Sequence, residues 1–422
     1  MRITPTLLER TSAALAEALR FEYPADAVLS QFFRENKALG ARERAFVAET
    51  VYAVLRRRRT LERIVGSRAS PRRLVIAALV RLAGYNQRQL EEALRRSEAE
   101  AFAALKAEPA GEPMLAELAD FPDWLVERLR PRLGDEALLA LARGLNQGAP
   151  LDLRVNTLKA TREQVLEQFA AEGIEARPCT YAPSGIRLKD KPALQRHPLY
   201  LSGAVEVQDE GSQLLGYLLA PKRGEMVADF CAGAGGKTLL IGALMRSTGR
   251  LYAFDVADKR LAKLRPRVAR SGLSNVHPVL IAGENDTRVK RLAGKLDRVL
   301  VDAPCSGLGT LRRNPDLKWR QTWEGVAELA RKQQDILAGA ARLLKPGGRL
   351  VYATCSILPE ENEAVVDAFL AAHPDFARVS AGEILARQQI PLECGETLRL
   401  LPHVHDTDGF YAAVLERRKA AI

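Results

Sequence analysis

Two cysteines and an aspartate stand where predicted strands end. The apolar segment at residues 296–304 carries Asp302 near its end and runs on to Cys305, and a second one, at residues 347–355, ends at Cys355. Because the carboxyl ends of parallel strands meet at one edge of a sheet, we expect these three side chains to converge beside a ligand crevice.

This set of groups suits covalent catalysis on a pyrimidine ring. Carbon 5 of cytosine is a poor nucleophile, but a thiolate that adds to carbon 6 turns the ring into an enamine-like species that attacks a sulfonium methyl group. Covalent addition divides one difficult step into easier ones, and it requires a cysteine that ionises readily. A carboxylate near ring nitrogen 3 would place the ring, and a base would remove the carbon 5 proton.

A glycine-rich turn follows the first strand of the same region. The strand EMVADF leads into CAGAGGKT and then into the apolar helix TLLIGALMR. Such a turn brings the backbone close to a bound ligand. The spacing matches neither GxGxxG nor a P-loop, so a simple strand-to-helix turn remains an alternative for this motif alone.

Acidic residues end the next two predicted strands. Asp255 lies twenty residues after Gly235, where a carboxylate can accept hydrogen bonds from both hydroxyl groups of a ribose. The following strand leads to Glu284 and Asp286, either of which could meet an adenine amino group. Each aspartate taken singly could instead cap a helix. Their order on successive strand ends favours an adenosyl cofactor.

The elements that must position these residues alternate regularly. Apolar strands in the segments 225–232, 249–256, 276–283, 296–303 and 347–355 are separated by helical stretches, which is typical of βα units around a parallel sheet. Residues 146–205 read as a small α+β segment. Residues 1–145 read as helical, with a central buried helix that begins at Leu74.

Composition limits the class of protein. The chain has 422 residues with 63 Lys and Arg against 52 Asp and Glu, a net charge of +11 that suits a polyanionic partner. Its five cysteines form no CxxC pair, so we expect no metal, and we assign no role to Cys179 or Cys394. The first residues resemble no signal peptide, and no apolar run could span a membrane. We expect a cytoplasmic protein without coiled-coil heptads, and therefore a monomer.

Longer motifs in the sequence narrow the predicted activity to one family. The chain resembles the Sun/RsmB family of RNA 5-methylcytosine methyltransferases in these segments: RVN (154–156), VQDEGSQ (207–213), DFCAGAGGKT (229–238), DAPCSGLGTLRRNPDLKWR (302–320), LVYATCSILPEENE (350–363) and HDTDGFYAAVL (405–415). The resemblance covers about residue 145 to the end of the chain. It implies a Rossmann-like catalytic domain over residues 206–422 that uses S-adenosylmethionine.

The resemblance also implies roles for individual residues. Cys355 matches the family nucleophile, Cys305 the cysteine that helps to release the product, and Asp302 the acidic residue beside the target cytosine and the cofactor. The matched cofactor contacts are Cys231, Ala232, Gly233, Ala234, Gly235, Gly236, Lys237, Asp255, Asp286 and Asp302. Two positions depart from the family pattern: Ala234 replaces a usual proline, and GENDT replaces a GDA-like string, which leaves Glu284 eligible beside the favoured Asp286.

The helical residues 1–145 resemble, more weakly, the NusB-like RNA-binding domain of the RsmB branch, and residues 146–205 would add a small RNA-binding α+β segment. That branch acts on 16S rRNA of the small subunit, so 16S rRNA is the expected partner. A tRNA cytosine-5 methyltransferase and a catalytically silent assembly factor that binds RNA are the alternatives. Intact Cys355, Cys305 and Asp302 argue against the silent protein.

Basic and aromatic residues near the chemical motifs are candidates for RNA contact. Arg312 and Arg313 follow the DAPCSG motif, and we expect them to bind phosphate. Trp319 is equally suited to stacking on an exposed base and to a core position. A solvated helix face is the default interpretation of the run Arg56–Arg59. Lys237 could bind the target base or stabilise the glycine turn, and the sequence does not decide between these roles.

Overall fold

The computed structural model describes residues 2–66 and 69–419. The chain forms two compact units. One comprises Met1–Gly148 together with Thr310–Trp323, and the other comprises Ala149–Gly309 together with Glu324–Ile422.

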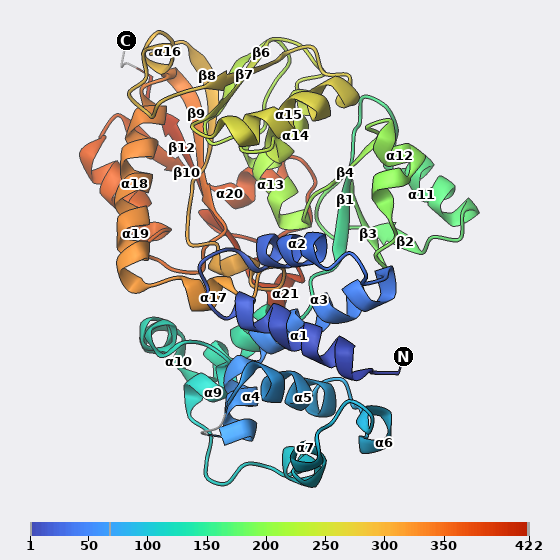
Figure 1. Cartoon of the computed structure of the whole chain (residues 1–422). Coiled ribbons are helices and arrows are strands. Elements are labelled where there is room, and N and C mark those ends of the chain that lie inside the picture. Colours follow the sequence, from blue (N-terminus) through green and yellow to red (C-terminus); the bar gives the residue numbers. More distant parts are fainter. Residues whose placement is uncertain (1, 67–68, 420–422) are drawn as a thin grey trace. The chain divides into compact units, whose positions relative to one another are not determined.

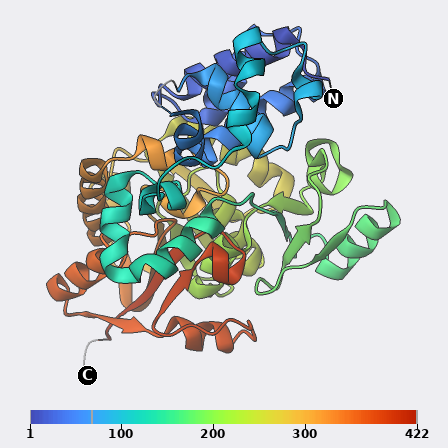
Figure 2. The same cartoon turned by 90° about the horizontal axis from the view of Figure 1, so that it is seen from below.

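The first unit is helical throughout its described residues (Figures 1 and 2). A central helix, α5, begins after Ser70, whose hydroxyl accepts a hydrogen bond from Arg73 N, and its residues from Leu74 to Val80 are all buried. The last long helix bends at Gly134, where φ is 71°. The helices are α1 (Pro5–Ala18), α2 (Ala25–Glu35), α3 (Ala41–Arg56), α4 (Arg58–Val65), α5 (Pro71–Arg81), α6 (Gln87–Leu90), α7 (Arg96–Glu100), α8 (Phe102–Lys106), α9 (Leu115–Ala119) and α10 (Asp123–Leu145).

The segment 310–323 joins the first unit although the sequence predicted an uninterrupted catalytic domain from residue 206 onward. Side chains of its short helix α17 (Leu317–Arg320) form hydrogen bonds with the helices of the first unit. The Lys318 ammonium is fully buried and donates hydrogen bonds to Arg56 O at 2.9 Å and Asn146 Oδ1 at 2.7 Å. Trp319 Nε1 donates to Leu55 O at 2.7 Å. Buried polar groups need such partners, and the first unit supplies them.

The second unit begins with a small antiparallel sheet in the order β2-β3-β1-β4 (Figure 2, green). Thr161 caps the neighbouring helix α11 by accepting a hydrogen bond from Gln164 N. The elements are β1 (Leu151–Val155), α11 (Arg162–Ala171), β2 (Ala176–Pro178), β3 (Gly185–Leu188), η2 (Leu194–Arg196), α12 (Pro198–Leu201) and β4 (Val205–Val207). This segment confirms the predicted α+β texture.

An eight-stranded sheet forms the rest of the second unit, in the order β10-β12-β9-β8-β5-β6-β7, with β11 paired to β12. The five strands from β9 to β7 in this order run parallel, and β10, β11 and β12 add an antiparallel edge (Figure 1). The strands are β5 (Met226–Asp229), β6 (Arg250–Asp255), β7 (Val276–Leu280), β8 (Leu296–Asp302), β9 (Leu344–Thr354), β10 (Phe376–Val379), β11 (Thr397–Leu400) and β12 (Phe410–Arg417).

Helices cover both faces of this sheet. Leu300 and Val351 pack on one face among residues of α13, α14 and α20, whereas Val299 and Leu350 pack on the other among residues of α18 and α19. Alternate residues of each strand therefore enter different cores, as expected for a sheet buried on both sides. The helices are α13 (Glu210–Leu219), α14 (Gly236–Leu244), α15 (Asp258–Ser271), α16 (Thr287–Lys290), α18 (Trp323–Ala341), α19 (Glu363–Ala372), α20 (Ala381–Ala386) and α21 (Pro402–His405), with the turn η3 (Leu308–Thr310).

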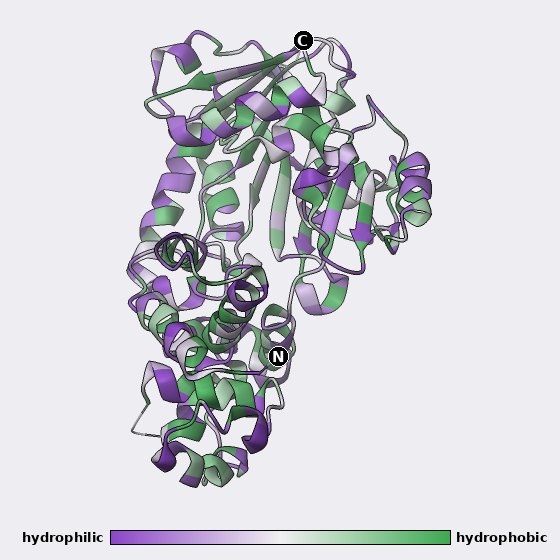
Figure 3. Cartoon of the chain, turned by 45° about the vertical axis from the view of Figure 1, so that its right-hand side comes forward, coloured by the Kyte–Doolittle hydropathy of each residue, from purple (hydrophilic) through white to green (hydrophobic). Residues whose placement is uncertain are grey.

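Hydrophilic and hydrophobic stretches alternate along the helices (Figure 3). Among the described residues, no helix has the length and apolar character needed to cross a membrane.

Candidate active site

The candidate residues lie where the order of the parallel strands reverses. From β5 the chain proceeds to β6 and β7 on one side, and then returns to β8 and β9 on the other. Ligands of open α/β sheets bind outside the carboxyl ends of strands at such a point. The strand ends there carry the glycine turn, Asp255, Asp302 and Cys355, so the predicted convergence is confirmed for the strands that bear them.

The glycine turn links β5 directly to α14. Ala232 N donates to Phe254 O at 2.9 Å and Gly235 N donates to Ala232 O at 2.8 Å, which folds the turn back over β6. Gly235 has φ of 85°, and a Cβ atom added there would lie 2.0 Å from Leu264 Cδ1. Only glycine fits this position. Gly233 faces open space instead, with no atom within 4 Å of an added Cβ.

Two arginines hold the outer side of the turn. Arg154, on β1, donates to Gly236 O at 2.5 Å and also to Gln208 Oε1. Arg267, on α15, donates to Ala234 O at 2.7 Å and pairs with Glu206 at 2.9 Å. With its carbonyl groups held in this way, the turn is rigid around the open space at Gly233.

The sequence motifs RVN and VQDEGSQ contain Arg154 and Gln208, yet sequence reasoning gave these residues no role. The available signal was an arginine inside a strand that is otherwise suited to burial. Arg154 is in fact only 2% exposed, and burial lowers its pKa to about 10. A charge this deep is retained only where hydrogen bonds satisfy it.

Asp255 supports the turn from the end of β6. One carboxylate oxygen accepts a hydrogen bond from Gly233 N at 2.8 Å, and the other accepts from Ala257 N at 2.7 Å. The side chain is therefore oriented at the cofactor turn, and each oxygen keeps a further lone pair for another donor. Its expected contact with a ribose is compatible with this geometry.

Asp286 is used as a helix cap. Its carboxylate accepts hydrogen bonds from Ala282 N and Arg288 N, both at 2.8 Å, and begins α16. These backbone donors lower the pKa of the carboxyl group. Asp286 therefore caps a helix, which was the alternative to an adenine contact that the sequence left open. Glu284, the other candidate, accepts a hydrogen bond from Asn285 Nδ2 at 2.8 Å.

Lys237 and Asp302 form an ion pair beside the cysteines. Lys237 Nζ lies 2.7 Å from Asp302 Oδ2, and the two side chains are 13% and 27% exposed. Burial opposes the charge on Lys237, but attraction to Asp302 outweighs it, aided by Cys355, and the pKa of Lys237 is raised overall. Lys237 is therefore a cation that is paired with Asp302 and lies within electrostatic range of Cys355, an arrangement that the sequence had not resolved.

The two cysteines are in contact. Cys305 Sγ lies 3.4 Å from Cys355 Sγ. The hydrogen bond with Cys355 is the largest cause that raises the pKa of Cys305 well above its ordinary value, followed by burial and then by the charges of Cys355 and Glu361. Either sulfur can donate this hydrogen bond, and the contact couples the ionisation of the two thiols.

Close backbone packing fixes the loop after Cys305. Gly309 N donates to Cys355 O at 2.8 Å, and Gly409 N donates to Gly309 O at 2.8 Å. A Cβ atom at Gly309 would lie 2.2 Å from Gly409 O. The loop therefore passes between the end of β9 and the start of β12, which sets where Cys305 can lie.

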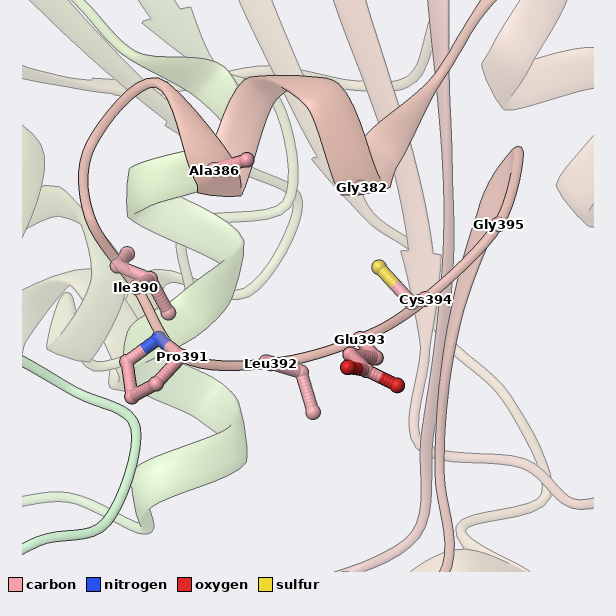
Figure 4. A pocket seen from close by; sticks show the side chains of 8 residues that line it. All are labelled: Gly382, Ala386, Ile390, Pro391, Leu392, Glu393, Cys394 and Gly395. Carbon is pink, nitrogen blue, oxygen red and sulfur yellow. The ribbon is translucent and has the colours of Figure 1, made fainter.

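The remaining cysteines are Cys231, Cys179 and Cys394. Cys231 packs beside the core under the turn, and burial raises the pKa of its thiol. Cys179 is buried, and burial raises its pKa too. Cys394 lines a surface pocket of about 640 Å³ between α20 and the following loop (Figure 4). That pocket holds none of the predicted catalytic residues.

The basic residues predicted to meet RNA are divided by their burial. Arg312 is only 4% exposed within the first unit and donates to Gly148 O at 3.4 Å, so its position does not suit a surface phosphate contact. Arg313 is half-buried. Trp319 is half-buried, and Leu55 and Arg58 engage its indole nitrogen and its ring, so the side chain is held within the first unit.

The run Arg56–Arg59 is not a solvated helix face, in contrast to the default interpretation. It lies at the junction of α3 and α4, where Arg57 pairs with Asp120 at 3.3 Å and Arg59 pairs with Asp123 at 2.6 Å. Arg58 pairs with Glu62 at 2.6 Å, and Arg56 donates to Arg312 O at 3.1 Å. These arginines hold the first unit together.

The sheet order, with a glycine turn at its reversal point and a cysteine pair beside it, places the second unit in the class of Rossmann-like α/β proteins with a ligand site at the strand ends. Comparison with known proteins gives the family. A family model described as 16S rRNA methyltransferase RsmB/F matches residues 216–416, and the model of the ferredoxin-like domain of such proteins matches residues 121–195. The chain belongs to the RsmB/F family of RNA cytosine-5 methyltransferases.

Individual relatives span most of the chain. The probable ribosomal RNA small subunit methyltransferase B of Synechocystis is 34% identical over 416 residues, which cover 91% of this chain and 93% of that protein. Ribosomal RNA small subunit methyltransferase B of Proteus mirabilis is 35% identical over 70% of this chain and 66% of its own length. The crystal structure of PH0851 superposes with a TM-score of 0.82 at 28% identity, covering 99% of this chain and all of that one.

Proposed function

We propose that the chain transfers a methyl group from S-adenosylmethionine to carbon 5 of a cytosine in 16S rRNA, with Cys355 as the covalent nucleophile. The observation that carries the proposal is the 3.4 Å contact between Cys305 and Cys355 beside the Lys237–Asp302 ion pair. The substrate follows from the relatives, whose names assign them to small-subunit rRNA.

The residues of the glycine turn fit an adenosyl cofactor. The open space at Gly233, the carbonyl groups held by Arg154 and Arg267, and the carboxylate of Asp255 would hold a ligand that has a ribose and a positive charge. When bound there, S-adenosylmethionine supplies an electrophilic methyl group. Asp255 would accept from the ribose hydroxyls, with Cys231 to Lys237 forming the adjoining wall. Both carboxylate oxygens of Asp286 already accept backbone hydrogen bonds, so a contact with adenine would use a second lone pair on one of them.

Cys355 begins the reaction. Its thiolate adds to carbon 6 of the cytosine, and Asp302 and Lys237 lie where they can orient the ring and balance the charge that develops on it. Carbon 5 then becomes nucleophilic and accepts the methyl group. A target base must leave its stack to enter such a site.

Cys305 is suited to the release step. Before addition, its hydrogen bond with Cys355 and the charge of Cys355 are two of the three largest causes that raise its pKa. Once Cys355 is bonded to the ring its negative charge is gone, and Cys305 can release its own proton to solvent. The Cys305 thiolate then accepts the carbon 5 proton, and the electrons of that C–H bond re-form the double bond between carbons 5 and 6 and expel Cys355 as a thiolate.

Methylation mapping tests the proposal. The protein and S-adenosylmethionine are incubated with small-subunit rRNA from cells that lack this modification and, separately, with tRNA, and new methylcytosines are located by bisulfite sequencing. We expect one new protected cytosine in 16S rRNA and none in tRNA. Methylation of tRNA alone would show a tRNA enzyme. Cofactor binding without methylation of either RNA would show a silent assembly factor. Either result would overturn the proposal.

A further inference from the structure

Glu361 is a fully buried carboxylate between β9 and α19, and the reaction described above does not use it. Its hydrogen-bond donors are neutral. Oε1 accepts from Ser306 N at 2.8 Å and from Gln333 Nε2 at 3.0 Å, and Oε2 accepts from Ser306 Oγ at 2.5 Å and also from Ser356 Oγ. A charge buried this deeply is costly unless its partners are well placed.

These partners lie next to the two cysteines. Ser306 follows Cys305 and Ser356 follows Cys355, so one carboxylate joins the loops that bear both thiols. The two hydroxyl oxygens lie 3.2 Å apart, and the two sulfur atoms lie 3.4 Å apart. The spacing of the serines thus parallels the spacing of the thiols one residue earlier.

Gln333, on α18, connects Glu361 with the start of the loop that bears Cys305. Its Nε2 donates to Pro304 O at 2.9 Å as well as to Glu361. Tyr352 OH, on β9, donates to Glu361 O at 2.6 Å and to Gln333 Oε1 at 3.2 Å. Gln333 and Tyr352 are themselves fully buried, so this hydrogen-bond network is anchored in the core.

The negative charge of Glu361 also acts on Cys305. It is one of the causes that raise the pKa of Cys305, after the hydrogen bond and charge of Cys355 and the effect of burial. Glu361 therefore influences Cys305 both through the hydrogen bonds to Ser306 and through its charge.

We propose that Glu361 is a positioning residue that clamps the two cysteine loops through Ser306 and Ser356, and so sets which thiol reacts, with Cys355 as the nucleophile and Cys305 as its partner. This inference deepens the proposed function and rests on it for the roles of the thiols. It assigns the division of labour between two chemically identical side chains to a third group that touches neither substrate nor cofactor.

Site-resolved alkylation tests the clamp without RNA or cofactor. The intact protein is treated briefly with iodoacetamide, at a conversion low enough that no molecule carries two labels, and the labelled cysteine is identified by peptide mass spectrometry over a pH series. We expect labelling of wild-type protein to favour Cys355 over Cys305. In Glu361→Gln, which keeps the shape but loses the charge, the ratio should fall about tenfold, because weaker hydrogen bonds to Ser306 and Ser356 loosen the two loops that bear the thiols.

Glu360→Gln is the matched control, because Glu360 precedes Glu361 in the same motif but its buried Oε2 has no hydrogen-bond partner among the described residues. It should leave the ratio unchanged. If Glu361→Gln, with a normal melting transition, keeps the wild-type ratio, the clamp is refuted.

A second variant separates charge from geometry and also serves if Glu361→Gln fails to fold. Ser306→Ala with Ser356→Ala removes both hydroxyl donors and keeps the carboxylate. Methyl transfer should fall about tenfold or more in kcat with little change in KM for RNA, while Cys305 stays the less reactive thiol. Full activity in this variant would contradict the positioning role. An inactive wild-type protein would refute the proposed function and leave the alkylation result to decide the clamp.

Discussion

Lys237 Nζ and Asp302 Oδ2 lie 2.7 Å apart, and this ion pair joins the first turn of α14 to the end of β8. The two residues come from strand–helix connections on opposite sides of the point where the strand order reverses. The pair therefore connects the glycine turn with the loop that carries Cys305.

Asp302→Asn should keep the fold and impair the reaction. The amide cannot balance the ammonium of Lys237, and hydrogen bonds to charged groups contribute about 1.5–3 kcal/mol. We expect kcat to fall roughly ten- to a hundredfold. Single-turnover methylation assays measure this effect. Asp297→Asn is the matched control, because Asp297 lies at the other end of β8 and also pairs with a lysine, Lys345. Equal losses in the two variants would show that the effect is structural.

Arg154→Gln should weaken cofactor binding. Without the guanidinium, the carbonyl group of Gly236 loses its donor and the glycine turn loosens. We expect the affinity for S-adenosylmethionine to fall about tenfold, or about 1.4 kcal/mol, as measured by calorimetry. Arg187→Gln removes another buried arginine of the same small sheet, one that pairs with Asp152 and Asp406. It should lower stability without changing cofactor affinity, and the reverse pattern would contradict the bracing role of Arg154.

Asp229 should make stability depend on pH. Burial is the main cause that raises its pKa from 3.8 to about 7, while Thr238 donates to one oxygen at 2.7 Å. Between these values the unfolded chain has lost this proton and the folded chain keeps it. The folded state therefore loses stability as the pH rises through this window, by at most about 1.4 kcal/mol per pH unit, and the loss is complete above about pH 7.

Asp229→Asn removes that dependence. Melting temperatures measured across the window should decline less with rising pH in the variant than in the wild type, so the variant gains most at neutral pH. Asp258→Asn, an exposed position, should follow the wild type. Parallel curves for wild type and Asp229→Asn would contradict the raised pKa.

Of the two arginines predicted to bind phosphate after the DAPCSG motif, only Arg313 is still a candidate, because Arg312 is buried. Arg313→Glu should weaken RNA binding and reduce the dependence of affinity on salt by about one counterion, while cofactor affinity stays constant. Filter-binding titrations over a salt series measure this. Arg88→Glu, an exposed arginine of α6, provides the control for charge alone. An unchanged salt dependence would remove Arg313 from the RNA interface. Arg312→Glu should instead destabilise the first unit, because Arg312 is buried.

Local sequence patterns predicted the catalytic half of the fold well. The parallel strands read as short apolar runs, and the glycine turn, Asp255, Asp302 and Cys355 lie at their ends as expected. The antiparallel strands β10 and β11 escaped notice because they are short and depend on pairing with β12. The sequence also did not predict that residues 310–323 belong to the first unit, because this grouping depends on contacts such as that of Lys318 with Asn146, which no local pattern encodes.

The supporting residues of the site were the harder part. Arg154, Arg267 and Glu361 act by hydrogen bonds to backbone groups or to serines far away in the sequence, at separations of 82, 33 and 55 residues. Periodicity and motif spacing report only nearby relations, so they mark such residues at most as charges in segments suited to burial. Their partners become visible only when the sheet brings them together.

The covalent link to RNA tests the central claim most directly. Wild type, Cys355→Ala and Cys305→Ala are incubated with unmodified 16S rRNA and S-adenosylmethionine, then separated under denaturing conditions, and the crosslinked peptide is identified by mass spectrometry. The account predicts that Cys305→Ala accumulates a protein–RNA adduct through Cys355, because release is impaired, and that Cys355→Ala forms none. An adduct through Cys305, with methylation surviving in Cys355→Ala, would contradict it.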